Sequence, residues 1–291
     1  TALVSALKRY RVDAHLVLVR TRDRGSMPGR EPTPWHFNHV IAAVEIGDTL
    51  TYLDPVCKNC DYGQLPLMDQ GSDALIISSG EEKLTRLPCD YPVQNHYSIA
   101  SSVSLGKDGI SVVTDTIRCS GFFAVKSRAR YSRRAESELY SLVSRGLLSG
   151  GLFPSIDEVI IPRLADESHK FEMIVHYSVS LPGGSSNLVP LSLNLHPLLF
   201  KLPAGGERRY PYNLGPKRHF SHKARIVLPD GWRCMGIPDS LNIENKHLEY
   251  SCSWKQNDNA LTLTSSLFTI QIVPDPSRVV IVKGGSASLH R

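Results

Sequence analysis

The sequence predicts an α+β protein in which one helix and an antiparallel sheet precede β-rich, sandwich-like domains. First, residues 1–10 carry apolar side chains at the i, i+3, i+4, i+7 spacing of one helix face, namely Leu3, Ala6, Leu7 and Tyr10. Second, residues 36–54 contain two β-prone runs separated by the turn residues Gly47 and Asp48. Third, residues 171–181 alternate apolar and polar side chains, as a half-buried strand does.

We expect the 291 residues to form three domains. Residues 1–90 contain the helix and the hairpin. Residues 91–185 form a β-rich domain with one inserted helix, because residues 134–148 have helical spacing and end near two glycines. Residues 186–291 begin with an extended connection rich in Pro and Gly and continue as a β-sandwich.

The composition is that of an ordinary globular protein, with a net charge of +5 and a hydrophobic share of 41%. No apolar run approaches the roughly 18 residues that cross a bilayer, so we expect no transmembrane segment. Basic side chains cluster in residues 118–134 and 208–223 without an aromatic stacking pattern, which favours solvated faces over a nucleic-acid interface. The second half of the chain has no glycine-rich phosphate loop and no metal-ligand cluster. We expect no cofactor and no metal.

His39 and Asp54 lie on the two runs of the predicted hairpin and form a candidate catalytic pair. If the turn is centred on Ile46 and Gly47, the two residues are directly opposite each other. If it is centred on Gly47 and Asp48, they are diagonal neighbours on the same face. Either register lets the carboxylate orient the imidazole and stabilise its protonated form, although such a pair is also compatible with a purely structural role.

Cys57 and Cys60 form a CxxC motif directly after Asp54. Such a motif is typical of a redox pair, half of a zinc site or a short structural disulfide. A zinc site needs two more ligands, and a redox motif normally opens a helix in a βαβ unit, which this sequence does not predict here. We therefore favour a disulfide or a pair of free thiols in a turn.

The segments FNHV, YLDP, GQLP and DQG followed by an apolar run occur in this order within residues 35–77. This order resembles the catalytic His and Asp region of the transglutaminase-like superfamily, in particular its secreted bacterial branch with flanking β-rich domains of unknown function. The resemblance implies that residues 1–90 are the C-terminal portion of a transglutaminase or papain-like core. His39 would be the catalytic base and Asp54 its orienting carboxylate. Trp35 would shield the base from water and Asn38 would orient it, although both residues are also compatible with simple packing or with satisfying backbone groups.

In this superfamily a nucleophilic cysteine begins a helix that precedes the His and Asp, and none of the six cysteines here has such a position. We therefore expect a fragment that starts within that helix, just after the nucleophile. The intact parent would be a cysteine-dependent acyl transferase or an amide or peptide hydrolase that acts on a protein or peptide, and this chain alone would be inactive. The missing N-terminal part could remain associated with it as a separate polypeptide.

The resemblance also implies an extracytoplasmic location, either periplasmic or secreted, although the sequence shows no signal peptide. Whether the protein is an enzyme stays open at this point. The alternative is a non-catalytic binding or scaffold protein of the cell envelope or surface with a degenerate core, because a fold does not by itself imply an activity.

Overall fold

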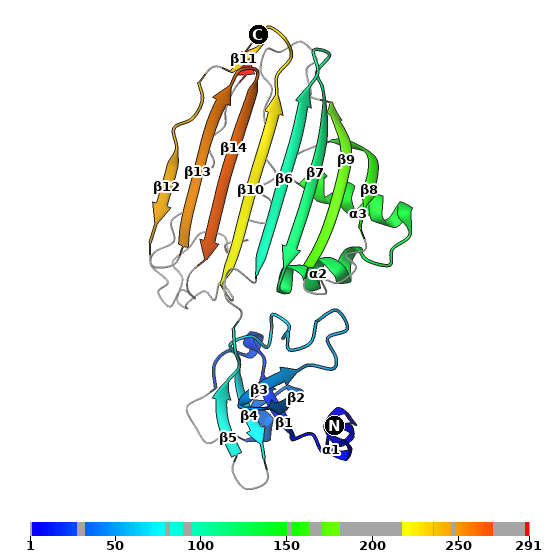
Figure 1. Ribbon diagram of the computed structural model, residues 1–291, viewed down its shortest axis with the longest axis vertical. Coiled ribbons are helices and arrows are strands. Elements are labelled where there is room, and N and C mark those ends of the chain that lie inside the picture. The colour runs from blue at the N-terminus through cyan, green and yellow to red at the C-terminus, as the bar shows by residue number, and fades with distance from the viewer. Residues whose placement is uncertain are drawn as a thin grey trace.

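The computed structural model describes residues 2–27, 33–78, 82–89, 95–149, 153–162, 170–180, 217–234, 236–245, 248–269 and 289–290. Within these residues it contains a five-stranded sheet, an eight-stranded sheet and a short two-stranded ribbon (Figure 1). The expected connection in residues 183–218 lies outside the described residues except for its last two positions. No described helix has the length and apolar character needed to cross a membrane.

The five-stranded sheet is antiparallel throughout and has the order β3-β2-β1-β4-β5. The hairpin predicted from the Gly47 turn forms its edge, and the turn residues are Gly47 and Asp48, because Ile46 pairs with Thr49. The elements of this part are α1 (Ala2–Arg9), β1 (Ala14–Arg20), the 3₁₀ turns η1 (Arg22–Arg24) and η2 (Pro34–His36), β2 (His39–Ile46), β3 (Thr49–Leu53), β4 (Asp73–Ile77) and β5 (Glu82–Arg86).

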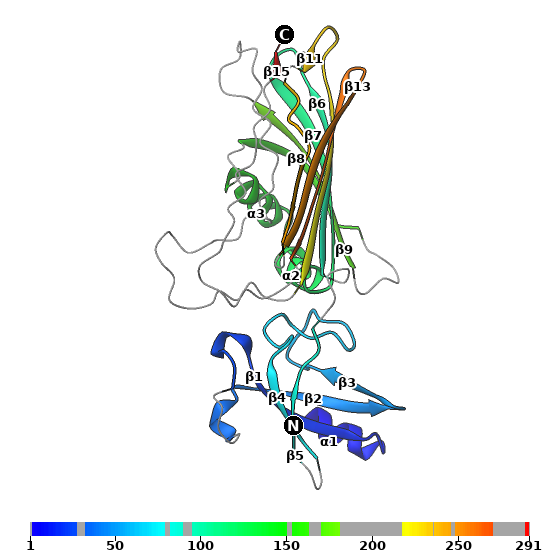
Figure 2. The same ribbon diagram turned by 90° about the vertical axis from the view of Figure 1, so that its left-hand side faces the viewer.

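The two faces of this sheet pack against different parts of the chain. Alternate residues of β2 point to opposite faces, so Ala42 and Val44 contact α1 through Val4, whereas Ile41 and Ala43 pack with Leu65. Leu65 belongs to the long connection between β3 and β4. His39 has the same parity as Ile41 and therefore lies on the face opposite α1. Figure 2 shows α1 on one side of the sheet and this connection on the other.

The larger sheet has the order β12-β13-β14-β10-β6-β7-β9-β8. All its neighbouring pairs are antiparallel except β10 and β6, which run parallel with His219 opposite His96. Its strands are β6 (His96–Leu105), β7 (Ile110–Ser120), β8 (Pro154–Ile160), β9 (Lys170–Ser180), β10 (Arg218–Val227), β12 (Leu241–Glu244), β13 (Leu248–Asn257) and β14 (Ala260–Thr269). The ribbon pairs β11 (Arg233–Cys234) with β15 (Leu289–His290).

One face of the larger sheet is covered by α2 (Phe122–Tyr131) and α3 (Glu136–Ser149), as Figure 2 shows edge-on. The core beneath them combines Phe122 and Phe123 of α2 with Phe220 of β10, whose side chain is fully buried. Burying one such side chain contributes about 1.5 to 3 kcal/mol. Asn95 joins these elements: its Oδ1 accepts a hydrogen bond from the Phe122 backbone N–H, and its carbonyl oxygen accepts one from His219.

The structure corrects the expected fold class. We expected a helix-plus-sheet, papain-like core followed by sandwich-like domains, but the described chain is β-rich, and only the eight-residue α1 packs on the N-terminal sheet. No sandwich forms among the described strands after residue 95, which join one sheet and the short ribbon. The reason is that the alternation of apolar and polar residues predicts which face of a strand is buried but not which strand pairs with it. The parallel pairing of β10 with β6 has no signal in the local sequence of either strand.

A row of polar side chains crosses the helix-covered face of the larger sheet. Ser101 Oγ donates a hydrogen bond to Asp115 Oδ1 at 2.6 Å and lies 3.0 Å from Nε2 of His222, while Tyr177 Oη donates to Asp115 Oδ2 at 2.9 Å. His222 Nε2 must therefore donate to Ser101, which leaves Nδ1 without a hydrogen-bond partner among the described residues. This buried environment disfavours the imidazolium and lowers the pKa of His222 to about 4.

We predict that His222 makes the larger sheet sensitive to acid. Its pKa is about 4 in the folded protein and about 6.5 when unfolded, so the unfolded state binds more protons between these values and stability is lost as the pH falls. The loss is on the order of 3 kcal/mol, and His222→Gln should remove that part of the pH dependence. Urea unfolding between pH 4 and 7 measures it, with His36→Gln as the control. An unchanged slope in His222→Gln would contradict the assignment.

Candidate functional site

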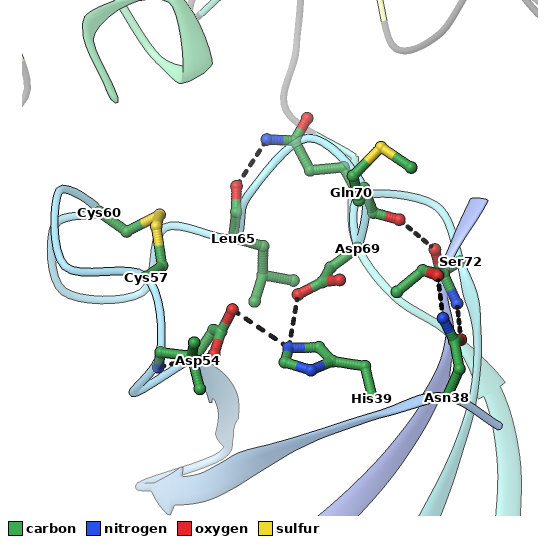
Figure 3. Close-up of polar contacts among 12 residues, drawn as sticks. Asn38, His39, Asp54, Cys57, Cys60, Leu65, Asp69, Gln70 and Ser72 are labelled. Atoms are coloured by element: carbon green, nitrogen blue, oxygen red, sulfur yellow. Dashed lines mark hydrogen bonds and ion pairs between the residues drawn. A yellow bond between two sulfur atoms is a disulfide. The ribbon is translucent and has the colours of Figure 1, made fainter. Parts of the chain in front are cut away.

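The candidate site lies on the side of the five-stranded sheet that α1 does not cover. Figure 3 shows its side chains. His39 is the first residue of β2 and pairs with Val19 of β1. Asp54 follows the last residue of β3. In the observed register Ala42 pairs with Leu53, so His39 and Asp54 are diagonal neighbours, which is the second of the two registers that the sequence allows.

The two predicted residues are in contact. Nε2 of His39 lies 3.2 Å from Oδ2 of Asp54, and the Asp54 side chain is only 4% exposed, whereas that of His39 is 25% exposed. The other carboxylate oxygen of Asp54 accepts a hydrogen bond from the Val56 backbone N–H, which fixes the rotation of the carboxylate. Within the described chain Nδ1 of His39 makes no hydrogen bond, so this nitrogen is free to exchange a proton with a bound group.

Asp69 is a third member of the site that the sequence analysis did not assign. Its Oδ2 lies 3.6 Å from Nε2 of His39, and its side chain is 2% exposed. This oxygen accepts no hydrogen bond from the described residues. Burial raises the pKa of Asp69 to about 6; the imidazole of His39 opposes this shift, and the negative charge of Asp54 adds to it.

The connection between Leu65 and Ser72 holds Asp69 in place through its own hydrogen bonds. Gln70 Nε2 donates to the Leu65 carbonyl at 2.8 Å, and Ser72 Oγ donates to the Met68 carbonyl at 2.8 Å. Gly71 has a φ of +68°, and a Cβ there would lie 2.5 Å from the Cys89 sulfur. The position two residues after Asp69 therefore requires glycine.

Trp35 and Asn38 lie just before β2, and neither side chain forms a hydrogen bond with the His39 ring. Trp35 is part of η2 and is 93% exposed, so its indole does not shield the imidazole from water. The Asn38 side chain is engaged with Thr21: Nδ2 donates to Oγ1 of Thr21 at 2.7 Å, and Oδ1 accepts from its backbone N–H at 3.0 Å. Asn38 thus ties the end of β1 to the start of β2 and leaves the orientation of His39 to the carboxylates.

Cys57 and Cys60 form a disulfide in the connection that follows Asp54. Next to it, the Arg128 guanidinium of α2 donates to the carbonyl of Asn59 at 2.7 Å and to Asp61 Oδ2 at 2.9 Å. The remaining cysteines, Cys89, Cys119, Cys234 and Cys252, are not part of a disulfide. Among the described residues, the hydrogen bond and ion pairs of the His39 ring are with carboxylates and not with a cysteine.

The sequence contained one signal for Asp69, although its role could not be read from it. The DQG segment lies between two apolar stretches, and an acidic residue at the entrance of a buried strand needs a partner. That partner is His39, thirty positions earlier in the chain. Only the folded connection brings the two together, because neither hairpin register nor helical spacing relates them.

We predict that replacing Asp69 by the isosteric Asn stabilises the protein above pH 6. The pKa of Asp69 is raised from 3.8 to about 6 in the folded state. Between these two pH values the folded state binds more protons than the unfolded state, so wild-type stability falls as the pH rises from about 4 to 6. Asp69→Asn should lack this fall and gain on the order of 3 kcal/mol at pH 7. Urea unfolding in EDTA measures the difference, with the exposed Asp48→Asn as the control. Equal destabilisation at every pH would show that the charge of Asp69 is required for folding.

One family of known proteins matches part of the chain. Residues 188–272 match DUF3858, a domain of unknown function for which a solved structure exists. The match covers less than half of the chain and includes β10 through β14. No curated protein and no solved structure is significantly similar to the chain. The match therefore describes the second half of the larger sheet and not the site around His39.

Proposed function

We propose that His39 and Asp54 are the base and the orienting carboxylate of a cysteine-dependent acyl transfer, as the resemblance of residues 35–77 to transglutaminase-like proteins implies. The observation that carries this proposal is that the two nitrogens of the His39 ring have different environments. A buried carboxylate holds Nε2, while Nδ1 belongs to a partly exposed ring and makes no hydrogen bond within the described chain. A proton-transfer residue in nucleophilic catalysis needs this arrangement.

The chemistry would proceed in two steps. His39 takes the proton of a thiol, the thiolate attacks the carbonyl carbon of an amide, and the carbon–nitrogen bond breaks as His39 returns the proton to the leaving amine. This leaves a thioester. Water or a second amine then attacks the thioester, yielding an acid or a new amide and restoring the thiol. Asp54 stabilises the imidazolium that forms in each step.

The thiol in this proposal comes from a segment that precedes residue 1 in a longer polypeptide. The cysteines outside the disulfide do not fit the role: Cys119 is buried, which raises its pKa to about 12, and the polar partners of the His39 ring among the described residues are carboxylates. His39 lies on the face of the sheet opposite α1, so in this proposal the upstream segment has to bring its thiol to that face. The chain of 291 residues alone would then be inactive.

Two further features support the same proposal. The DUF3858 domain matched by residues 188–272 is found in transglutaminase-like proteins. The disulfide between Cys57 and Cys60 fits an oxidising, extracytoplasmic compartment, because such bonds are rarely kept in the cytosol. A protein or peptide would be the substrate in this setting. The helical lobe of a papain-like fold is no part of the proposal, which concerns the chemistry of the site only.

We predict that a polypeptide extended upstream of residue 1 through its nearest cysteine will incorporate a fluorescent amine into a glutamine peptide or hydrolyse that peptide. His39→Ala should lower the rate at least a hundredfold, as expected for loss of a general base, and Asp54→Asn should also lower it. His176→Gln, in the larger sheet, is the control. A mass-spectrometric search for the thioester adduct locates the nucleophile.

The same assay on residues 1–291 alone should give no product. Trapping of that chain by a thiol-reactive substrate analogue at one of its own cysteines would contradict the upstream thiol. If the extended polypeptide has no cysteine near the start of its helix, or is inactive with it, the His39 pair is a relic, and a non-catalytic binding role at the cell envelope replaces the enzyme.

A further inference from the structure

Two buried carboxylates and one imidazole nitrogen converge on the same point at the candidate site. The ligand atoms of His39, Asp54 and Asp69 all lie within 4.8 Å of one another. The residues come from three separate elements: the start of β2, the end of the hairpin, and the connection before β4. Figure 3 shows both carboxylates directed at Nε2 of His39. One imidazole N–H cannot donate a good hydrogen bond to two acceptors at once, so the second carboxylate is left without a full partner.

Asp69 gives the independent sign that something else binds here. Its side chain is 2% exposed and points at Nε2 of His39 from 3.6 Å, and its Oδ2 has no hydrogen-bond partner among the described residues. No Lys or Arg in the described part of the chain forms an ion pair with Asp54 or Asp69. Burying a carboxylate without a hydrogen-bond donor or a cation costs free energy. A positively charged ligand bound to this oxygen would offset that cost.

The separations fit a transition-metal ion. Zinc bonds to His nitrogen and carboxylate oxygen at about 2.0 to 2.2 Å, and tetrahedral geometry then places two ligand atoms roughly 3.3 Å apart. The observed separations from Nε2 are 3.2 Å to Asp54 and 3.6 Å to Asp69. A dication would also balance the two carboxylates. Calcium and magnesium fit poorly, because they prefer six or more oxygen ligands and no nitrogen.

We propose that His39, Asp54 and Asp69 bind one zinc-like divalent ion, with a fourth coordination position open to water. Three protein ligands with an open fourth position are the arrangement of catalytic and inhibitory zinc sites, not of closed structural ones. The ligands are fifteen residues apart in each interval, a spacing that resembles no metal motif, which explains why the sequence predicted no metal. The CxxC motif, for which zinc was considered and not favoured, forms a disulfide.

This site does not rest on the proposed acyl transfer, but the two would exclude each other. An ion on Nε2 of His39 places the ring proton on Nδ1, and that nitrogen can then no longer accept a proton from a thiol. Asp54 would bind the ion instead of stabilising an imidazolium. Zinc would therefore act as a reversible inhibitor of any thiol chemistry at His39, and its removal by a chelator would restore it.

The test is zinc binding by residues 1–291, freed of metal with EDTA and studied without reductant so that the disulfide stays formed. Isothermal titration with zinc chloride should give one ion per chain at micromolar concentration or below, and magnesium chloride should give none. Asp69→Asn and His39→Gln should each weaken zinc binding at least tenfold. Thermal unfolding should show that zinc raises the melting temperature of the wild-type chain and not of these variants, provided that each folds without zinc.

The chain offers a matched control. His15 lies near Asp13 and Glu45, at 3.4 Å and 3.6 Å, in a second cluster of similar composition whose carboxylates are exposed. His15→Gln should bind zinc as the wild type does. The proposal is overturned if no zinc binds, or if His15→Gln abolishes binding while His39→Gln keeps it. Because neither a thiol nor a substrate is present, the result is independent of whether acyl transfer is found.

Discussion

The burial of two carboxylates beside a single imidazole is the constraint on which the candidate site depends. Asp54 and Asp69 are both nearly excluded from water, and the only described cationic partner for either is His39. Such a cluster is stable only when its charges are balanced, by a proton on Asp69, by a protonated ring or by an added cation. Each of these three ways of balancing the charge is a different state of the site. The concentrations of protons and metal ions therefore determine which chemistry the site can perform.

Local structure around the site could be predicted from sequence because its signals are local. The helical spacing in residues 1–10 and the turn at Gly47 correspond to α1 and to the β2–β3 hairpin. The exact register could not be chosen, since a two-residue shift in pairing keeps every side chain on its face. The fold class was wrong for a different reason: the partner of β10 is β6, which alternation in either strand does not encode.

Among the candidate residues too, local contacts could be predicted from the sequence and long-range contacts could not. His39 and Asp54 lie within one hairpin, so their proximity followed from the turn. Asp69 reaches them only because the connection after β3 folds back over the sheet, held by Gln70 and by the left-handed backbone at Gly71. Trp35 and Asn38, whose roles the family resemblance implied, have other surroundings: the Trp35 side chain is exposed, and the Asn38 side chain is hydrogen-bonded to Thr21. Adjacency in a strand places alternate side chains on opposite faces, and a turn such as η2 adds a further rotation.

The parallel pairing of β10 with β6 has a consequence for how this part of the chain is defined as a unit. The region that matches DUF3858 begins at residue 188, so β6 to β9 fall outside it although they continue the same sheet. A polypeptide cut at that boundary would expose the full length of β10 as an open edge, with Phe220 and Ile226 uncovered on one face. Such an edge invites pairing with other chains. The region that matches the family and the continuous sheet therefore have different limits in this protein.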